Sequence, residues 1–85
     1  MGWYVYILRC GDGSLYTGCT DDVARRLAAH QRGRGAKYTR SHLLVELVYR
    51  EAAEDRSAAL RREAAIKRLS RQEKLSLIAS APPPD

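Results

Sequence analysis

Two short stretches near the N-terminus decide the fold: Trp3-Tyr4-Val5-Tyr6-Ile7-Leu8 and Ser14-Leu15-Tyr16-Thr17-Gly18-Cys19. The first is aromatic and β-branched throughout, and the second carries further residues that favour β-strands. Between them, Gly11-Asp12-Gly13 interrupts the apolar pattern with residues typical of tight turns. The sequence therefore predicts that the two stretches pair as a β-hairpin.

The length of the hairpin loop decides which side chains share a face of the sheet. A two-residue loop, Asp12-Gly13, would place Tyr6 and Tyr16 on opposite faces. A three-residue loop with Gly13 left-handed pairs Leu8 with Tyr16, so that Tyr6 and Tyr16 become diagonal neighbours on one face. We favour the three-residue loop. The opposite face then carries Trp3, Val5, Ile7 and Leu15.

A first helix and a third strand are expected after the hairpin. Thr20 is a suitable N-cap, and Asp21 and Asp22 would lie in the first helical turn, where the helix dipole favours anions. Gly33 would end this helix. The apolar run over residues 43–49 predicts the third strand.

Two more helices are expected in the C-terminal half. The second helix is predicted to begin after Asp55 or Ser57 and to end near Leu69. Ser70-Arg71-Gln72-Glu73 has the pattern of a capping box, which marks the start of a third, short helix.

The expected order of elements is β-β-α-β-α-α, which predicts an α/β (α+β) fold with a small, three-stranded, largely antiparallel sheet flanked by helices. With 85 residues, the chain has room for one domain. We assign residues 1–80 to that domain and residues 81–85, which include three prolines, to a disordered tail.

Composition favours a polyanionic partner over a membrane. Lys and Arg outnumber Asp and Glu by 15 to 10, which suits binding to nucleic acid. No acidic residue occurs from Val23 to Val45. The candidate nucleic-acid-binding residues within that stretch are Arg25, Arg32, Arg34, Lys37 and Arg40. A solvated basic face is the simpler interpretation of the same residues.

The two cysteines, Cys10 and Cys19, form no disulfide framework and fit no common zinc spacing. No signal peptide and no membrane-spanning run is apparent. These features predict a cytoplasmic protein with reduced thiols.

Four motifs together resemble the GIY-YIG nuclease superfamily, and most closely its small, stand-alone bacterial branch. They are Tyr4-Val5-Tyr6, Tyr16-Thr17-Gly18, Arg26 with His30, and Glu63 in Arg-Arg-Glu-Ala-Ala-Ile-Lys, in this order from Trp3 to about Leu69. The sequence departs from the family pattern in that Tyr4 replaces a glycine, Thr17 replaces an isoleucine, and Cys19 stands where some relatives carry a basic residue.

The resemblance implies metal-dependent hydrolysis of phosphodiester bonds. Tyr16 would activate the attacking water, and Tyr6 would orient that water or the phosphate. Arg26 would stabilise the charge that develops on the phosphate, and His30 would position water or transfer a proton. Glu63 would be the metal ligand. One carboxylate suffices for Mg²⁺ (or Mn²⁺), since Mg²⁺ keeps most of its waters and gains oxygens from the substrate.

Each residue also has a structural interpretation. Tyr6 and Tyr16 are in strands, where tyrosines commonly pack in a core or an interface. His30 on an amphipathic helix is as well explained by packing, and Glu63 can pair with Lys67 one helical turn later.

The functional expectation is an endonuclease that acts on DNA rather than RNA, with structure preference and a link to repair or recombination by analogy. A protein partner could supply specificity, because the chain lacks the extra domains of many relatives. One alternative is a nucleic-acid-binding module that has lost turnover. Another is a subunit whose basic face docks an acidic protein.

Overall fold

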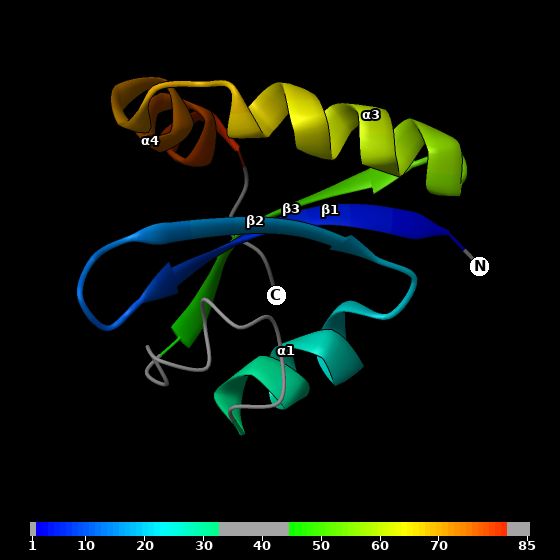
Figure 1. Ribbon diagram of the computed structural model, residues 1–85, viewed down its shortest axis with the longest axis horizontal. Helices are drawn as coiled ribbons and strands as arrows, with labels where there is room; N and C mark the ends of the chain where they lie inside the picture. Colours follow the sequence, from blue (N-terminus) through cyan, green and yellow to red (C-terminus); the bar gives the residue numbers. More distant parts are fainter. Residues whose placement is uncertain (1, 33–44, 82–85) are drawn as a thin grey trace.

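The computed structural model describes residues 2–32 and 45–81. Within them the strands are β1 (Trp3–Cys10), β2 (Leu15–Thr20) and β3 (Val45–Ala53), and the helices are α1 (Val23–Gln31), α3 (Arg56–Lys67) and α4 (Arg71–Ser80). The three strands form an antiparallel sheet with the order β2-β1-β3. Helices α3 and α4 lie over one face of the sheet and α1 lies over the other (Figure 1). The predicted fold class and element order are confirmed.

The hairpin adopts the three-residue loop. Leu8 pairs with Tyr16 and Tyr6 pairs with Gly18. The Cys10 amide donates to the Ser14 carbonyl at 2.9 Å, and the Gly13 amide donates to the Cys10 carbonyl at 2.8 Å. Gly13 has a φ of +88°, in the region where a glycine is favoured. The predicted register is therefore confirmed.

Each face of the sheet has its own apolar cluster. The side facing α3 and α4 buries Val5, Ile7, Tyr49, Ala59 and Ile66, with Trp3 and Leu15 packed against them. The side facing α1 buries Tyr6, Leu8, Cys10 and Val45, with Tyr16, Leu27 and Leu47 packed against them. Because neighbouring residues of a strand point to opposite faces, β1 contributes to both clusters.

A bulge in β3 changes which residues face α3. Ile7 pairs with Tyr49 and Leu8 pairs with Leu47, so Val48 is an extra residue between them. Leu47 packs toward α1, whereas Tyr49, two residues later, belongs to the cluster on the opposite face. There the Tyr49 hydroxyl donates to Glu51, which also accepts from Arg62 of α3 at 2.8 Å. The bulge thus joins β3 to α3.

Helix starts differ from the prediction in one case. The N-cap of α1 is Asp22 rather than Thr20, and α1 has no acidic residue in its first turn. The Thr20 hydroxyl instead accepts from the Asp22 amide at 3.1 Å, which places Asp22 to cap the Arg25 amide. Asp55 caps α3, as one of the two predicted starts, and the capping box of Ser70 and Glu73 is present at α4.

Other boundaries shift modestly. The third strand, predicted over residues 43–49, starts at Val45 within the described chain and continues to Ala53. Of the predicted tail, Ala81 is the C-cap of α4 and packs against the core, and residues 82–85 lie outside the described part. No helix in residues 2–32 and 45–81 has the length and apolarity needed to cross a membrane.

Replacing Gly13 by Ala should destabilise the hairpin by about 1 kcal/mol, because an L side chain is disfavoured at positive φ. A Cβ at Gly13 meets no other atom within 4 Å, so this cost is conformational and not steric. Gly13→Asn should cost less, since Asn tolerates the left-handed region. The measurement is urea unfolding with Gly2→Ala as the control; equal stabilities of Gly13→Ala and Gly2→Ala would contradict the loop assignment.

Candidate active site

Three of the predicted site residues form an aromatic cluster between the sheet and α1. The Tyr6 hydroxyl lies 3.1 Å from His30 Nε2. The ring centroids are 6.5 Å apart for Tyr6 and Tyr16, 6.0 Å for Tyr6 and His30, and 5.3 Å for Tyr16 and His30. Tyr6 and His30 are buried, whereas Tyr16 is partly exposed. Of the two tyrosines, Tyr16 is therefore the one that solvent reaches more readily.

Gly18 creates the space that the two tyrosines occupy. A Cβ at this position would lie 2.6 Å from the Tyr6 hydroxyl oxygen, 2.8 Å from Tyr6 Cζ and 3.2 Å from Tyr16 Cε2. Contacts this short are not tolerated, so any side chain here would displace Tyr6. A glycine inside a strand often marks such a close approach.

Arg26 is joined to the same cluster, whose buried members are kept neutral mainly by their burial. Burial raises the pKa of Tyr6 to about 12, although a hydrogen bond from the Arg26 guanidinium acts in the opposite direction. Burial, and secondarily the charge of Arg26, lowers the pKa of His30. At neutral pH the Tyr6 phenol therefore keeps its proton and the His30 imidazole is uncharged. A neutral His30 can accept the Tyr6 proton at Nε2 while Tyr6 accepts from Arg26.

Glu63 lies on the other side of β2, in α3. Its side chain is only 16% exposed, and its Oε2 is 2.8 Å from Lys67 Nζ. Burial and a hydrogen bond to Glu63 raise the pKa of Cys19 to about 11. The Cys19 thiol is thus protonated at neutral pH and donates to the carboxylate.

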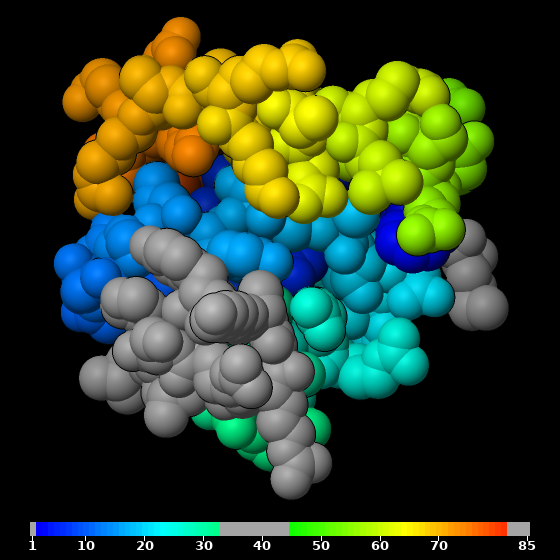
Figure 2. All heavy atoms as spheres, in the orientation of Figure 1, coloured from blue at the N-terminus to red at the C-terminus, as the bar shows by residue number. Residues whose placement is uncertain are grey.

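Lys67 connects the two sides of the site. The hydrogen bond to Glu63 raises the pKa of Lys67, and Tyr16 and Cys19 make smaller contributions in the same direction. The Lys67 ammonium group and the Tyr16 phenol therefore interact electrostatically. Strand β2 is an edge strand, and its atoms are exposed in a band between α3 and α1 (Figure 2). Tyr16 on one face of β2 and Cys19 on the other therefore contribute to a single site along this edge.

The donors at this edge fit a hard, hydrated divalent cation. Glu63 offers carboxylate oxygen, which Mg²⁺ and Mn²⁺ accept, and the neighbouring thiol is protonated. The described residues contain no group of three or more His, Cys, Asp or Glu side chains able to hold a metal. A cation at Glu63 would thus keep most of its waters, as Mg²⁺ commonly does. Two residues from Cys19, the Thr17 hydroxyl is buried in β2 and has no hydrogen-bond partner among the residues that the structure describes.

The predicted nucleic-acid-binding residues are only partly described. Arg25 is exposed and forms a surface ion pair with Asp21 at 3.3 Å. Arg32 is exposed at the C-terminal end of α1. Arg34, Lys37 and Arg40 lie outside the described residues. Arg25 and Arg32 are accessible to a partner, and the nucleic-acid-binding role stays a prediction.

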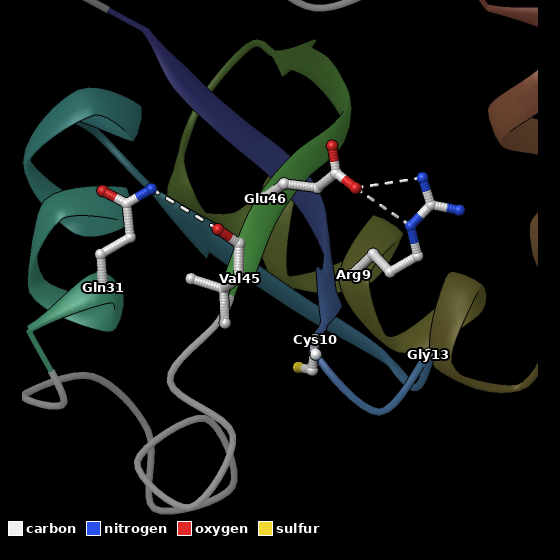
Figure 3. Close-up of a pocket in the computed structure, with 7 residues that line it drawn as sticks. Arg9, Cys10, Gly13, Gln31, Val45 and Glu46 are labelled. Carbon is white, nitrogen blue, oxygen red and sulfur yellow. Dashed lines mark hydrogen bonds and ion pairs between the residues drawn. The ribbon is translucent and has the colours of Figure 1, made fainter.

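A separate hollow of about 580 Å³ opens at the C-terminal end of β1, beside Arg9 and Cys10 (Figure 3). Its described lining consists of Arg9, Cys10, Gly11, Gly13, Gln31, Val45 and Glu46. The Gln31 amide reaches the Val45 carbonyl oxygen at 3.5 Å across this hollow, and Arg9 pairs with Glu46 at 3.1 Å beside it. None of the predicted catalytic residues belongs to this lining, so the tyrosine cluster is a distinct place on the molecule.

Sequence reasoning gave no functional part to Gly18, Cys19 or Lys67. For Gly18 the signal was a glycine inside a strand. Lys67 was considered only as the helical neighbour of Glu63, and no sequence pattern shows that it also lies near Tyr16. The hydrogen bond from Cys19 to Glu63 depends on how α3 crosses β2, which spacing alone does not reveal.

A family model for the GIY-YIG catalytic domain matches residues 2–76. The chain belongs to this family. Proteins of the family are typically endonucleases, and they generally use a divalent metal ion.

Similar proteins place the chain in one branch of the family. A UPF0213 protein from Streptococcus sanguinis is 55% identical over 75 residues, covering 88% of this chain and 86% of that protein. The solution NMR structure of the UPF0213 protein from Bacillus halodurans is 48% identical, with a TM-score of 0.60 over 93% of this chain and 84% of that one. A second NMR structure, from E. faecalis, is 41% identical, with a TM-score of 0.61 over 93% and 85%.

Gly18→Ala should destabilise the protein by about 1–3 kcal/mol, because the added methyl group overpacks the two tyrosines. It should also break the hydrogen bond between Tyr6 and His30. The measurements are thermal unfolding and the ¹⁵N chemical shift of His30 Nε2, which should move toward that of a nitrogen without this partner. Gly2→Ala is the control, since a Cβ there meets only the Ala53 carbonyl oxygen at 3.9 Å; an unchanged His30 signal in Gly18→Ala would contradict the packing.

Stability should fall as pH drops from about 7 toward 5, because His30 is held neutral in the folded state. Its pKa lies below the ordinary value of 6.5 in the folded protein, so the unfolded chain binds the proton first. The contribution of the neutral imidazole is complete above the unfolded pKa and is lost as pH falls through the folded one.

The pH dependence of stability should be weaker in His30→Gln, which has no imidazole to titrate at this position. Denaturant unfolding of both proteins across this pH range measures the difference. Equal slopes would show that His30 is not held neutral by its surroundings.

Proposed function

We propose that the protein is a metal-dependent endonuclease that hydrolyses phosphodiester bonds in DNA, with Mg²⁺ (or Mn²⁺) as its cofactor. The observation that supports this most strongly is that Tyr16, in the aromatic cluster that Arg26 joins, and Cys19, hydrogen-bonded to Glu63, lie on opposite faces of one edge strand. A phenol, a guanidinium and a carboxylate are the groups needed to activate water, bind a phosphate and hold a divalent cation. Family membership supports the same reaction type.

Tyr16 is the proton acceptor for the attacking water. It is more exposed than Tyr6, so an attacking water can reach its hydroxyl. As the Tyr16 oxygen takes the proton, the water oxygen bonds to phosphorus and the bond to the leaving oxygen breaks.

Tyr6 and His30 are positioning residues in this proposal. Tyr6 keeps its proton and is linked to both His30 and Arg26. Its hydrogen bond with Arg26 restrains the guanidinium beside the aromatic cluster, where it can contact the phosphate in a fixed, planar orientation. The more direct roles, in which Tyr6 orients the water or the phosphate and His30 positions water or transfers a proton, stay predictions.

Glu63 holds the divalent cation. When bound, such a cation supplies a Lewis acid that neutralises negative charge as it develops on the phosphate. Glu63 is fixed by helix α3, whose Ile66 is fully buried against the sheet, so the carboxylate keeps its place relative to Tyr16.

The substrate is DNA, guided to the site by the positive charge of the chain. The net charge of +5 favours any nucleic acid, and Arg25 and Arg32 on α1 extend the basic surface beside Arg26. A preference for branched DNA, an association with repair or recombination, and a protein partner that supplies specificity all follow from the family analogy.

Glu63→Gln and Tyr16→Phe should each lower the rate of Mn²⁺-dependent nicking of supercoiled DNA by about 100-fold or more, since each removes a group that acts in the transition state. Glu46→Gln and Tyr4→Phe are the matched controls. Glu46 pairs with Arg9 beside the separate hollow, and Tyr4, in the central strand β1, has Arg50 of β3 over its ring.

Branched and single-stranded DNA should be assayed beside the supercoiled substrate, with Mn²⁺ or EDTA. Nicking that survives both site substitutions would contradict the assigned roles. DNA binding that is sensitive to salt but unaccompanied by cleavage, in every metal, would instead identify a binding module without turnover.

A further inference from the structure

Lys67 forms an ion pair with Glu63, the carboxylate proposed to bind the divalent cation. Its Nζ lies 2.8 Å from Glu63 Oε2, with the Lys67 side chain 52% exposed and the Glu63 side chain 16% exposed. The Cys19 thiol donates to the same carboxylate. Glu63 therefore has an ammonium partner and a thiol partner.

A divalent cation and an ammonium group compete for such a site. Both seek the oxygens of Glu63, and their like charges repel at short distance. The lysine stem is long and flexible, so the ammonium can move away without any movement of α3. Besides Glu63, the charges of Tyr16 and Cys19 also raise the pKa of Lys67, so the ammonium group interacts electrostatically with both.

We propose that Lys67 competes with the divalent cation for Glu63 and, once displaced, contacts the substrate phosphate beside Tyr16. The inference rests on the proposed function, because it assumes that Glu63 holds the metal. It makes Lys67 a residue that links metal binding to substrate binding. Metal-free protein keeps the carboxylate paired, and metal-bound protein presents an additional cation to DNA.

A purely structural ion pair predicts something different. Pairs of Glu and Lys one helical turn apart stabilise many helices slightly. In that case removing Lys67 would change the affinity for metal no more than removing any other positive charge. Metal affinity therefore separates the two explanations, where a loss of activity alone would not.

The test measures Mn²⁺ binding to the full chain by the EPR signal of free Mn²⁺, at constant ionic strength. Lys67→Met keeps an unbranched side chain without its charge and should bind Mn²⁺ roughly threefold to tenfold tighter than the wild type. Lys74→Met removes the same charge from α4 and should change the affinity by less than about twofold. At saturating Mn²⁺, Lys67→Met should nick supercoiled DNA more slowly than Lys74→Met, because the phosphate contact is lost.

Glu63→Gln separates failure of the inference from failure of the proposed function. If Glu63→Gln abolishes the Mn²⁺ site but Lys67→Met binds no more tightly than Lys74→Met, competition by Lys67 is overturned and the metal assignment stands. If nicking by Lys67→Met and Lys74→Met is equal at saturating Mn²⁺, the phosphate contact is overturned. A Mn²⁺ site that survives Glu63→Gln overturns the metal assignment and the inference together.

Discussion

Two tyrosine rings from paired strands pack over a glycine that leaves no room for a methyl group, and the site depends on this contact. Gly18 lies opposite Tyr6 in the hairpin, and a Cβ there would fall 2.6 Å from the Tyr6 hydroxyl oxygen. Because that space is open, Tyr6 contacts His30 and Arg26 of α1, while Tyr16 stays partly exposed to solvent. A hairpin slipped by one residue would reverse the faces and separate the tyrosines.

The position of β2 at the edge of the sheet explains how so small a domain assembles its site. An inner strand would be covered on both sides by neighbouring strands, whereas the free edge of β2 lies exposed between α1 and α3 (Figure 2). Alternation along β2 directs Tyr16 toward α1 and Cys19 toward Glu63. Arg26, hydrogen-bonded to Tyr6, and Glu63, hydrogen-bonded to Cys19, thus lie on opposite faces of the sheet, and the β2 edge lies between the proposed phosphate and metal sites.

Much of this arrangement could be predicted from sequence, because local rules determine it. Gly11-Asp12-Gly13 set the register, and alternation then placed Tyr6 and Tyr16 together. Three features could not be predicted. The bulge at Val48 depends on packing against α3. Asp22 replaces Thr20 as N-cap because Thr20 hydrogen-bonds the Asp22 amide instead. The proximity of Lys67 to Tyr16 depends on the angle at which α3 crosses β2.

The central claim is that a divalent cation binds at Glu63, beside the Tyr16 edge of β2. Paramagnetic broadening by Mn²⁺ in ¹H–¹⁵N NMR spectra of the whole protein tests this claim most directly, because the effect falls steeply with distance from the ion. The account predicts that the first amide signals to vanish belong to Gly18 and Cys19 and to residues 63–67. Broadening centred on the acidic side chains at Glu46 or Glu73, or no broadening at all, would contradict it.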